Sequence, residues 1–169
     1  MKLFKEILGY TLGGLMFVGA IPLLFWFLSG RPFPYRPCWG LAVVAIILML
    51  SGLALSVWSI VYMKRVGKGN PMDAFGHEVA PRTRHLMTDG PYRLSRNPML
   101  SGTFLYLTGI CLWLWRWPVW LWFALFVVIM LMQVRSEEKR LLNDFGDEYR
   151  DYCRKTGRFL PFSWRKGKE

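Results

Sequence analysis

The sequence predicts an all-α, polytopic membrane protein with about four transmembrane helices and a cytoplasmic amphipathic helix at its C-terminal end. Hydrophobic residues make up 53% of the 169 residues, which is too high for an ordinary soluble domain of this length. The chain also contains four uncharged stretches, each about as long as the roughly 20 residues that cross a bilayer core. Because backbone polar groups in lipid must be hydrogen-bonded within their own segment, these stretches should be helices.

The first two helices are expected over about residues 7–29 and 38–63. The first apolar run is longer than that of a typical signal peptide and lacks a clear cleavage site, so we expect a retained helix. A polar loop over 64–97 follows, and its seven glycines and prolines should prevent any long regular element.

The third and fourth helices are expected over about 98–115 and 118–134. Pro98 suits the first turn of a helix, where its missing N–H costs nothing. Only Arg116-Trp117 separates these two helices, which predicts a tight antiparallel hairpin. Tryptophans crowd the helix ends, as expected for side chains that anchor at a membrane interface. They are Trp39, Trp113, Trp115, Trp117, Trp120 and Trp122.

The segment 135–169 has a different character. Apolar residues recur there at roughly helical spacing among charged ones, which indicates an amphipathic helix on the membrane face or folded over the cytoplasmic loop. They are Leu141, Leu142, Phe145, Tyr149, Tyr152 and Cys153. Gly146 can bend this helix. Together the four helices, the loop and this segment form a single membrane domain over residues 1–169.

The positive charge predicts the orientation. Two Lys/Arg precede the first helix, seven lie in 64–97 and ten follow from Arg135 onward, whereas the other connections hold only Arg31, Arg36 and Arg116. By the positive-inside rule, both termini and the large loop are cytoplasmic. The same charge attracts anionic membrane lipids. A nucleic-acid partner is a poor alternative, because no nucleic-acid-binding motif is present. The oligomeric state is not predicted.

The cysteines and histidines predict neither a disulfide framework nor a metal site. Cys38, Cys111 and Cys153 are dispersed and odd in number, without metal or redox spacing. His77 and His85 lie in a stretch interrupted by Gly and Pro, so a shared helical face with neighbouring carboxylates is doubtful.

Two polar elements abut the predicted membrane helices on the cytoplasmic side. The first is the block Gly90–Met99. In it Arg93 and Arg96 are three residues apart, so on a helical turn they would point the same way and bind a carboxylate or phosphate, or else anchor to lipid headgroups. Asn97 can bind a ligand or merely cap the third helix. The second element is the pair Glu137-Glu138, which is either functional or simply solvated and paired to neighbouring cations.

Both elements resemble the motifs of one family. Gly90-Pro91-Tyr92-Arg93-x-x-Arg96-Asn97-Pro98 is similar to the G-P-Y-R-x-x-R-[HN]-P motif of the superfamily of isoprenylcysteine carboxyl methyltransferases and phospholipid N-methyltransferases. The stretch Glu137-Glu138-x-x-Leu141-x-x-x-Phe145-Gly146-x-Glu148-Tyr149-x-x-Tyr152, followed by Arg158-x-x-Pro161, resembles its second signature. The resemblance covers about residues 84–161. Asn97 and Leu100 stand where many members have His and Tyr, which leaves the methyl acceptor open.

The resemblance implies an integral membrane methyltransferase that uses S-adenosylmethionine. It places six residues at the cofactor, namely Tyr92, Arg96, Asn97, Pro98, Glu137 and Glu138. It implies a lipid-like or lipidated acceptor, either a carboxylate oriented by Arg93 or Arg158, or an amine that gives a proton to Glu137 or Glu138. Two other classes stay open: a nicotinamide-dependent membrane reductase of the sterol-reductase type, and a non-catalytic protein whose loop binds headgroups.

Overall fold

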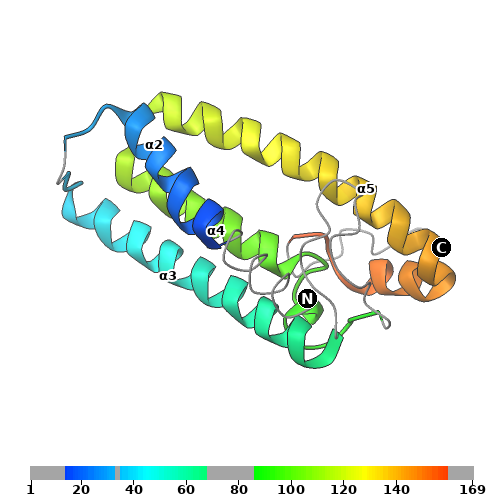
Figure 1. The fold of residues 1–169 in the computed structure, drawn as a ribbon. Helices are drawn as coiled ribbons and strands as arrows, with labels where there is room; N and C mark the ends of the chain where they lie inside the picture. The colour runs from blue at the N-terminus through cyan, green and yellow to red at the C-terminus, as the bar shows by residue number, and fades with distance from the viewer. Residues whose placement is uncertain (1–13, 33–34, 68–85, 160–169) are drawn as a thin grey trace, which may run out of the picture. The chain divides into compact units, whose positions relative to one another are not determined.

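The computed structural model describes residues 14–32, 35–67 and 86–159. These residues form helices and turns, with no strand among them (Figure 1). In chain order the elements are the π-helical turn η1 (Leu15–Ala20), α2 (Ile21–Ser29), α3 (Trp39–Tyr62), the π-helical turn η2 (Met63–Gly67), the 3₁₀ turn η3 (Gly90–Arg93), α4 (Pro98–Leu114) and α5 (Trp117–Lys155). The all-helical prediction is confirmed for the part of the chain that is described.

The chain divides into two compact units. The first comprises residues 1–53 and 103–130, and the second comprises 54–102 and 131–169. One end of each of the helices α3, α4 and α5 belongs to the first unit, and the other end belongs to the second.

The first unit has an apolar core in which residues from α2, α4 and the start of α5 meet. Its buried members are Phe25, Leu107, Ile110, Cys111, Leu114 and Val119. Gly109 lets α3 and α4 approach closely, because a Cβ at this position would lie 2.7 Å from the carbonyl oxygen of Ala45. Backbone cannot swing away as a side chain can, so this contact requires glycine.

A two-residue turn joins α4 to α5. Trp115 adopts a positive φ of 44°, which is uncommon for a residue with a side chain, and Arg116 follows it. The tight hairpin predicted from the sequence is present, with the turn at Trp115-Arg116 rather than at Arg116-Trp117. Arg31, just after α2, donates from Nε to the carbonyl oxygen of Leu114 at the end of α4 (3.4 Å) and lies over the ring of Tyr35.

The outward faces of these helices are apolar. Phe27 is 82% exposed and Trp39 is 84% exposed, and many aliphatic side chains along α3 and α5 are exposed as well. A surface of this kind is typical of contact with lipid. Within the described residues, the helices Trp39–Val66 and Trp117–Lys155 are long and apolar enough to cross a membrane, while Leu15–Ser29 and Pro98–Leu114 are apolar but shorter. The count of four crossings therefore stays a prediction.

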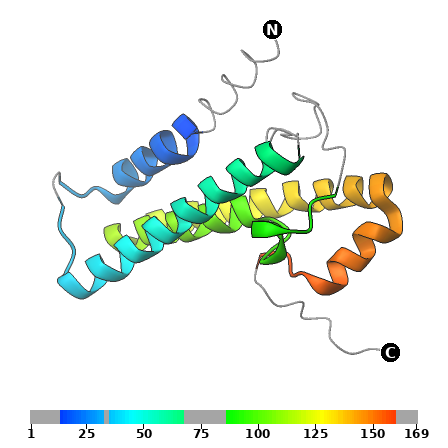
Figure 2. The same ribbon diagram turned by 90° about the horizontal axis from the view of Figure 1, so that it is seen from below.

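Helix α5 differs from the prediction that the fourth helix ends near 134. It continues through the charged residues to Phe145, because no Gly or Pro occurs between Val134 and Phe145 and a change of polarity does not interrupt backbone hydrogen bonds. The break comes at Gly146, where φ is 51° and ψ is −119°. Figure 2 shows the C-terminal part of α5 turning back there. The bend foreseen at Gly146 is confirmed.

The second unit has a core of tyrosines. Tyr92 from η3 and Tyr149 and Tyr152 from the bent part of α5 are all buried. Tyr62 at the end of α3 and Leu141 and Phe145 on α5 pack against them. Of the apolar stripe predicted for 135–153, all members but one belong to this cluster, and the exception, Leu142, is exposed. Residues 7–13, His77, His85 and Pro161, which figure in the predictions, lie outside the described residues.

Candidate functional site

The turn η3 places Tyr92 in the core of the second unit. Gly90 opens the turn with a φ of 60°, and a Cβ there would lie 2.5 Å from Cε2 of Tyr62. The backbone conformation therefore favours glycine, and the Tyr62 ring would have to move to admit a Cβ. The Tyr62 and Tyr92 rings lie 6.3 Å apart between centroids. The glycine that begins the Gly90–Met99 block thus has a structural reason: it allows the end of α3 to pack on η3.

The end of the block starts helix α4. Pro98 is its first residue and is buried, as predicted for a first-turn proline. The carbonyl of Asn97 accepts the first helical hydrogen bond from the Ser101 N–H (2.9 Å), so Asn97 holds the N-cap position by its backbone. Its side-chain amide donates to the carbonyl oxygen of Arg158 (3.4 Å). Asn97 therefore links the start of α4 to the C-terminal segment.

Residues 157–159 lie against this same block. The Arg96 N–H donates to the carbonyl of Gly157 (2.9 Å), and the Asn97 N–H donates to that of Arg158 (3.2 Å). Two buried serines reinforce the contact: Ser95 Oγ donates to the Arg158 carbonyl (3.3 Å), and Ser101 Oγ donates to that of Phe159 (3.1 Å).

Glu138 lies between two arginines. Its Oε1 is 2.9 Å from Nη1 of Arg96 and accepts a hydrogen bond from Nε of Arg158 at 3.0 Å. Its Oε2 accepts a second hydrogen bond, from Nη2 of Arg158. The side chains of Arg96 and Glu138 are each only 14% exposed. Arg158 thus grips the carboxylate with the forked geometry typical of strong arginine–carboxylate pairs, and this contact raises the pKa of Arg158.

Arg96 has one further partner and one buried nitrogen without any. Its Nη1 donates to Sγ of Cys153 (2.6 Å) as well as to Glu138. Its Nε is buried, and no described residue accepts a hydrogen bond from it. A buried N–H without an acceptor lowers the stability of a folded protein, and such groups commonly donate a hydrogen bond to water or to a ligand.

A hydrogen bond between two tyrosines joins the bent part of α5 to the turn η3. The hydroxyl of Tyr152 donates to the backbone carbonyl of Tyr92 (2.6 Å). Burial raises the pKa of both tyrosines above the ordinary value, and the nearby charge of Glu137 raises that of Tyr92 further. Arg96 acts in the opposite direction on Tyr152. Both hydroxyls therefore stay protonated at neutral pH, and Glu137 lies near enough to Tyr92 to act on it electrostatically.

The structure separates the two arginines of the block. The 3₁₀ turn ends at Arg93, whose side chain is exposed, whereas Arg96 is drawn inward to Glu138. The condition under which both would point the same way, a shared helical turn, is absent. Of the residues predicted for the site, Tyr92, Arg96, Asn97, Pro98, Glu137, Glu138 and Arg158 gather in the second unit, while Arg93 lies at its surface.

Sequence reasoning missed four contributors to this cluster. The sequence assigned no site role to four residues that each contact a predicted site residue: Tyr62, Ser95, Ser101 and Cys153. Ser95 and Ser101 flank the block, and small hydroxyl residues beside a helix start are a usable local signal. Tyr62 and Cys153 carry no such signal, because their contacts depend on the folded chain.

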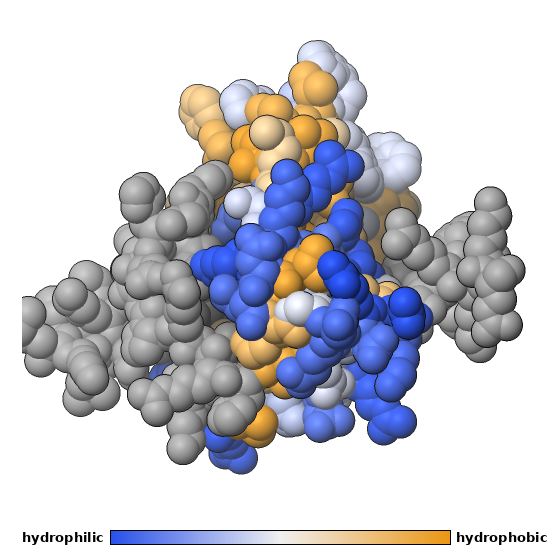
Figure 3. Space-filling model, turned by 90° about the vertical axis from the view of Figure 1, so that its right-hand side faces the viewer, coloured by the Kyte–Doolittle hydropathy of each residue, from blue (hydrophilic) through white to orange (hydrophobic). Residues whose placement is uncertain are grey.

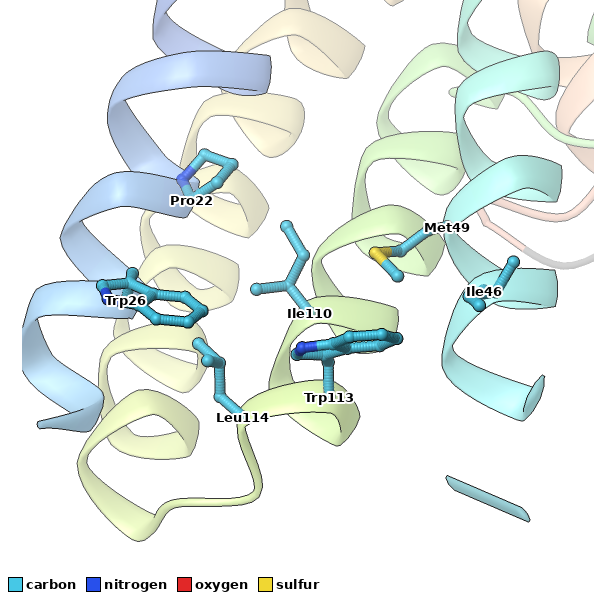
Figure 4. Close-up of a pocket in the computed structure, with 7 residues that line it drawn as sticks. All are labelled: Pro22, Trp26, Ile46, Met49, Ile110, Trp113 and Leu114. Atoms are coloured by element: carbon cyan, nitrogen blue, oxygen red, sulfur yellow. The ribbon is translucent and has the colours of Figure 1, made fainter. Parts of the chain in front are cut away.

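A separate, shallow groove of about 340 Å³ lies in the first unit, between α2, α3 and α4 (Figure 4). It is lined by Pro22, Trp26, Ile46, Met49, Ile110, Trp113 and Leu114. None of these side chains ionises, so the groove can hold an apolar group but supplies no chemistry.

The chemistry-bearing side chains are therefore those of the second unit. Figure 3 shows a face on which hydrophilic side chains gather around a few hydrophobic ones. The cluster offers two guanidinium groups, two carboxylates and a set of buried tyrosines. Such an arrangement can bind a ligand that carries both a carboxylate and a positive charge. Within the described residues, no group of three or more potential metal ligands occurs.

The comparison with protein families gives one match. A family model described as phospholipid methyltransferase matches residues 41–148, which is more than half of the chain, so the chain belongs to this family. No curated protein and no solved structure matches it. The matched region includes the Gly90–Met99 block and Glu137-Glu138 but ends before Arg158. Membership implies a membrane methyltransferase that acts on lipid.

Proposed function

We propose that this member of the phospholipid methyltransferase family uses S-adenosylmethionine to methylate a lipid-like or lipidated acceptor at the cytoplasmic face of a membrane. The observation that carries the proposal is the partly buried cluster of Arg96, Glu138 and Arg158 beside Tyr92 and Glu137. It joins both motifs of the family signature at one place.

The residues of the cluster suit this cofactor. S-adenosylmethionine has an amino-acid end, with a carboxylate and an amine, and a positively charged sulfur. No described residue accepts a hydrogen bond from the buried Nε–H of Arg96, so this group can donate one to the carboxylate of the cofactor. Glu137 and Glu138 offer negative charge for the cationic groups, and Tyr92, Asn97 and Pro98 form the surrounding wall.

The bound cofactor would supply an activated methyl group. The chain's own task is then to align the acceptor with it and to keep water away, which is the main source of acceleration when two reactants meet in a fixed geometry. Arg93, exposed at the end of η3, is positioned to attract the anionic group of an acceptor at the membrane surface.

The acceptor is an amine or a carboxylate. An amine must lose a proton to attack, and Glu137 or Glu138 is the group to receive it. A carboxylate needs no base and would only have to be oriented by Arg93 or Arg158. The family description favours a phospholipid, so an amine headgroup is the first acceptor to test.

The orientation follows from the charge distribution. Both termini, the 64–97 segment and the bent end of α5 belong on the cytoplasmic side, where a water-soluble cofactor is available. The acceptor then arrives from the adjacent leaflet.

Ligand titration tests the proposal. Purified protein in detergent is titrated with S-adenosylmethionine, S-adenosylhomocysteine and NADPH while its thermal unfolding is followed. We expect the first two to raise the unfolding temperature and NADPH to leave it unchanged, since a ligand that binds only the folded state stabilises it. Stabilisation by NADPH alone would make the protein a reductase, and stabilisation by none of the three would leave a headgroup-binding protein.

A further inference from the structure

An arginine is fixed at one end of the groove in the first unit. Arg31 is the second residue after α2, and its Nε donates to the carbonyl oxygen of Leu114, which lines the groove (3.4 Å). Ser29 Oγ donates to the carbonyl oxygen of Trp26, another lining residue (2.6 Å), and accepts a hydrogen bond from the Arg31 N–H (3.2 Å). The groove of Figure 4 therefore has a cation tied to both α2 and α4, the helices that carry Trp26 and Leu114.

The guanidinium of Arg31 keeps donors for a ligand. Its Cζ lies over the ring of Tyr35, 4.1 Å from the ring centroid. Nε is engaged by Leu114, but no described residue accepts a hydrogen bond from the two Nη groups. An arginine that is held in this way by a ring and a carbonyl can donate two parallel hydrogen bonds to the oxygens of a phosphate.

The described part of the first unit contains no acid that could pair with this arginine. Within residues 14–32, 35–53 and 103–130, the charged side chains are Arg31, Arg36 and Arg116, and no Asp or Glu occurs. Arg116 lies in the exposed turn only two residues after Leu114. This unbalanced positive charge attracts an anion from outside the chain. A zwitterionic headgroup would find no carboxylate for its amine here, so the charge favours an anionic phospholipid.

The groove suits an acyl chain. Its volume of about 340 Å³ is at the small end of the range for ligand sites, and every side chain that lines it is apolar or aromatic. Ile46 is one of them and is 42% exposed, so the groove is open to the surroundings of the helices. These helices are apolar enough to lie in a bilayer, where lipid acyl chains are the apolar groups at hand. A free phosphate ion would leave the groove empty.

We propose that Arg31 and the groove form a binding site for one anionic phospholipid, whose phosphate is held by the guanidinium and one of whose acyl chains lies along the groove. The site goes beyond the proposed methyl transfer, because a headgroup such as that of phosphatidylglycerol has no nitrogen to methylate. By the orientation expected from the charge distribution, Arg31 is on the non-cytoplasmic side, so the lipid comes from that leaflet.

Photocrosslinking tests the site. The full-length protein in neutral detergent is mixed with phosphatidylglycerol that carries a diazirine on one acyl chain, and after irradiation the adducts are mapped by peptide mass spectrometry. We expect adducts on groove residues of both α2 and α4. Unlabelled phosphatidylglycerol should compete about fivefold more effectively than phosphatidylcholine with the same chains, which is the selectivity expected from one basic residue near a membrane surface. Excess inorganic phosphate should leave most of the labelling in place, because the acyl chain still occupies the groove.

Two variants separate the headgroup from the chain. Arg31→Gln should weaken the competition by phosphatidylglycerol about fivefold and abolish its advantage over phosphatidylcholine. Arg36→Gln, which removes the same charge from the same connection, is its control and should keep both. Ile46→Trp should weaken both lipids about threefold or more, because the larger side chain takes the place of the acyl chain. Ile47→Trp is the matched control, since Ile47 is 60% exposed and does not line the groove.

Four results would overturn the proposal. They are adducts spread evenly over the apolar helix faces, equal competition by phosphatidylcholine, competition by phosphate as strong as that by the lipid, and equal effects of Arg31→Gln and Arg36→Gln. The last would mark a diffuse attraction of anions rather than a site. If Arg31→Gln does not fold, Ile46→Trp on α3 still tests the groove, and wild-type labelling there is equally contrary.

Discussion

Replacing Gly146 by alanine should destabilise the protein and disconnect its C-terminal segment. Gly146 has a φ of 51° and a ψ of −119°, a region that residues with a Cβ rarely enter, and forcing one there costs about 1–3 kcal/mol. No atom lies within 4 Å of the position that a Cβ would take, so the cost comes from the backbone alone. Straightening α5 would relieve it, but Arg158 would then lose Glu138.

Gly40→Ala is the matched control. Gly40 lies in helix α3 with an ordinary φ and nothing within 4 Å of its Cβ position, so alanine there should be neutral or stabilising by up to about 1 kcal/mol. Reversible denaturant unfolding monitored by circular dichroism measures both variants, and the affinity for S-adenosylhomocysteine reports on the site. The reasoning is refuted if Gly146→Ala is as stable as wild type, because alanine would then be accommodated without strain.

Four other predictions concern individual side chains in the two units. Gly90→Ala should lower the free energy of unfolding by about 1–3 kcal/mol because of backbone strain, and the Tyr62 ring must also move. In the Tyr62→Ala background, Gly90→Ala should still cost the backbone strain and should lose only the cost of the clash with the ring. If Gly90→Ala costs nothing in that background, the positive φ is unimportant. Gly109→Ala should cost about 1–3 kcal/mol because its Cβ meets the Ala45 carbonyl, with Gly19→Ala, which meets nothing, as the control in the same assay. Tyr152→Phe should cost about 0.5–1.5 kcal/mol by removing the bond to the Tyr92 carbonyl. Since burial raises the pKa of Tyr92 and Tyr152, their contribution to stability is complete below about pH 10 and is lost as the pH rises further, so an ultraviolet titration in which both ionise near their ordinary pKa would contradict their burial.

The helices could be predicted because their signals are local. Uncharged runs, Pro98 at a helix start and a short polar turn each act within a few residues. The helix continues past residue 134, where the fourth membrane helix was expected to end. A switch from apolar to charged residues changes what surrounds a helix, and the hydrogen bonding of α5 continues to the first residue whose backbone departs from it, Gly146.

The site was only partly accessible from the sequence. Motif resemblance identified Arg96, Glu138 and Arg158 as candidates, but it carried no information on which of these side chains form ion pairs with one another. The pairing of Glu138 with Arg158 depends on the bend between them, and the packing of Tyr62 on Gly90 joins two segments across the 64–97 stretch. Such contacts are set by tertiary structure, so no local pattern reveals them. Arg93 and Arg96 do not share a helical turn, the condition under which they would point the same way, because the turn ends at Arg93.

Methyl transfer to lipid is the measurement that tests the central claim most directly. The purified protein is incubated with methyl-labelled S-adenosylmethionine and vesicles containing phosphatidylethanolamine, and the lipid is then extracted and treated with mild base. We predict that label enters the lipid and survives the base, as expected for a methyl group on nitrogen, and that replacing both Glu137 and Glu138 by glutamine abolishes its entry. Folded protein that binds the cofactor and transfers no label to any lipid or lipidated acceptor would contradict the account.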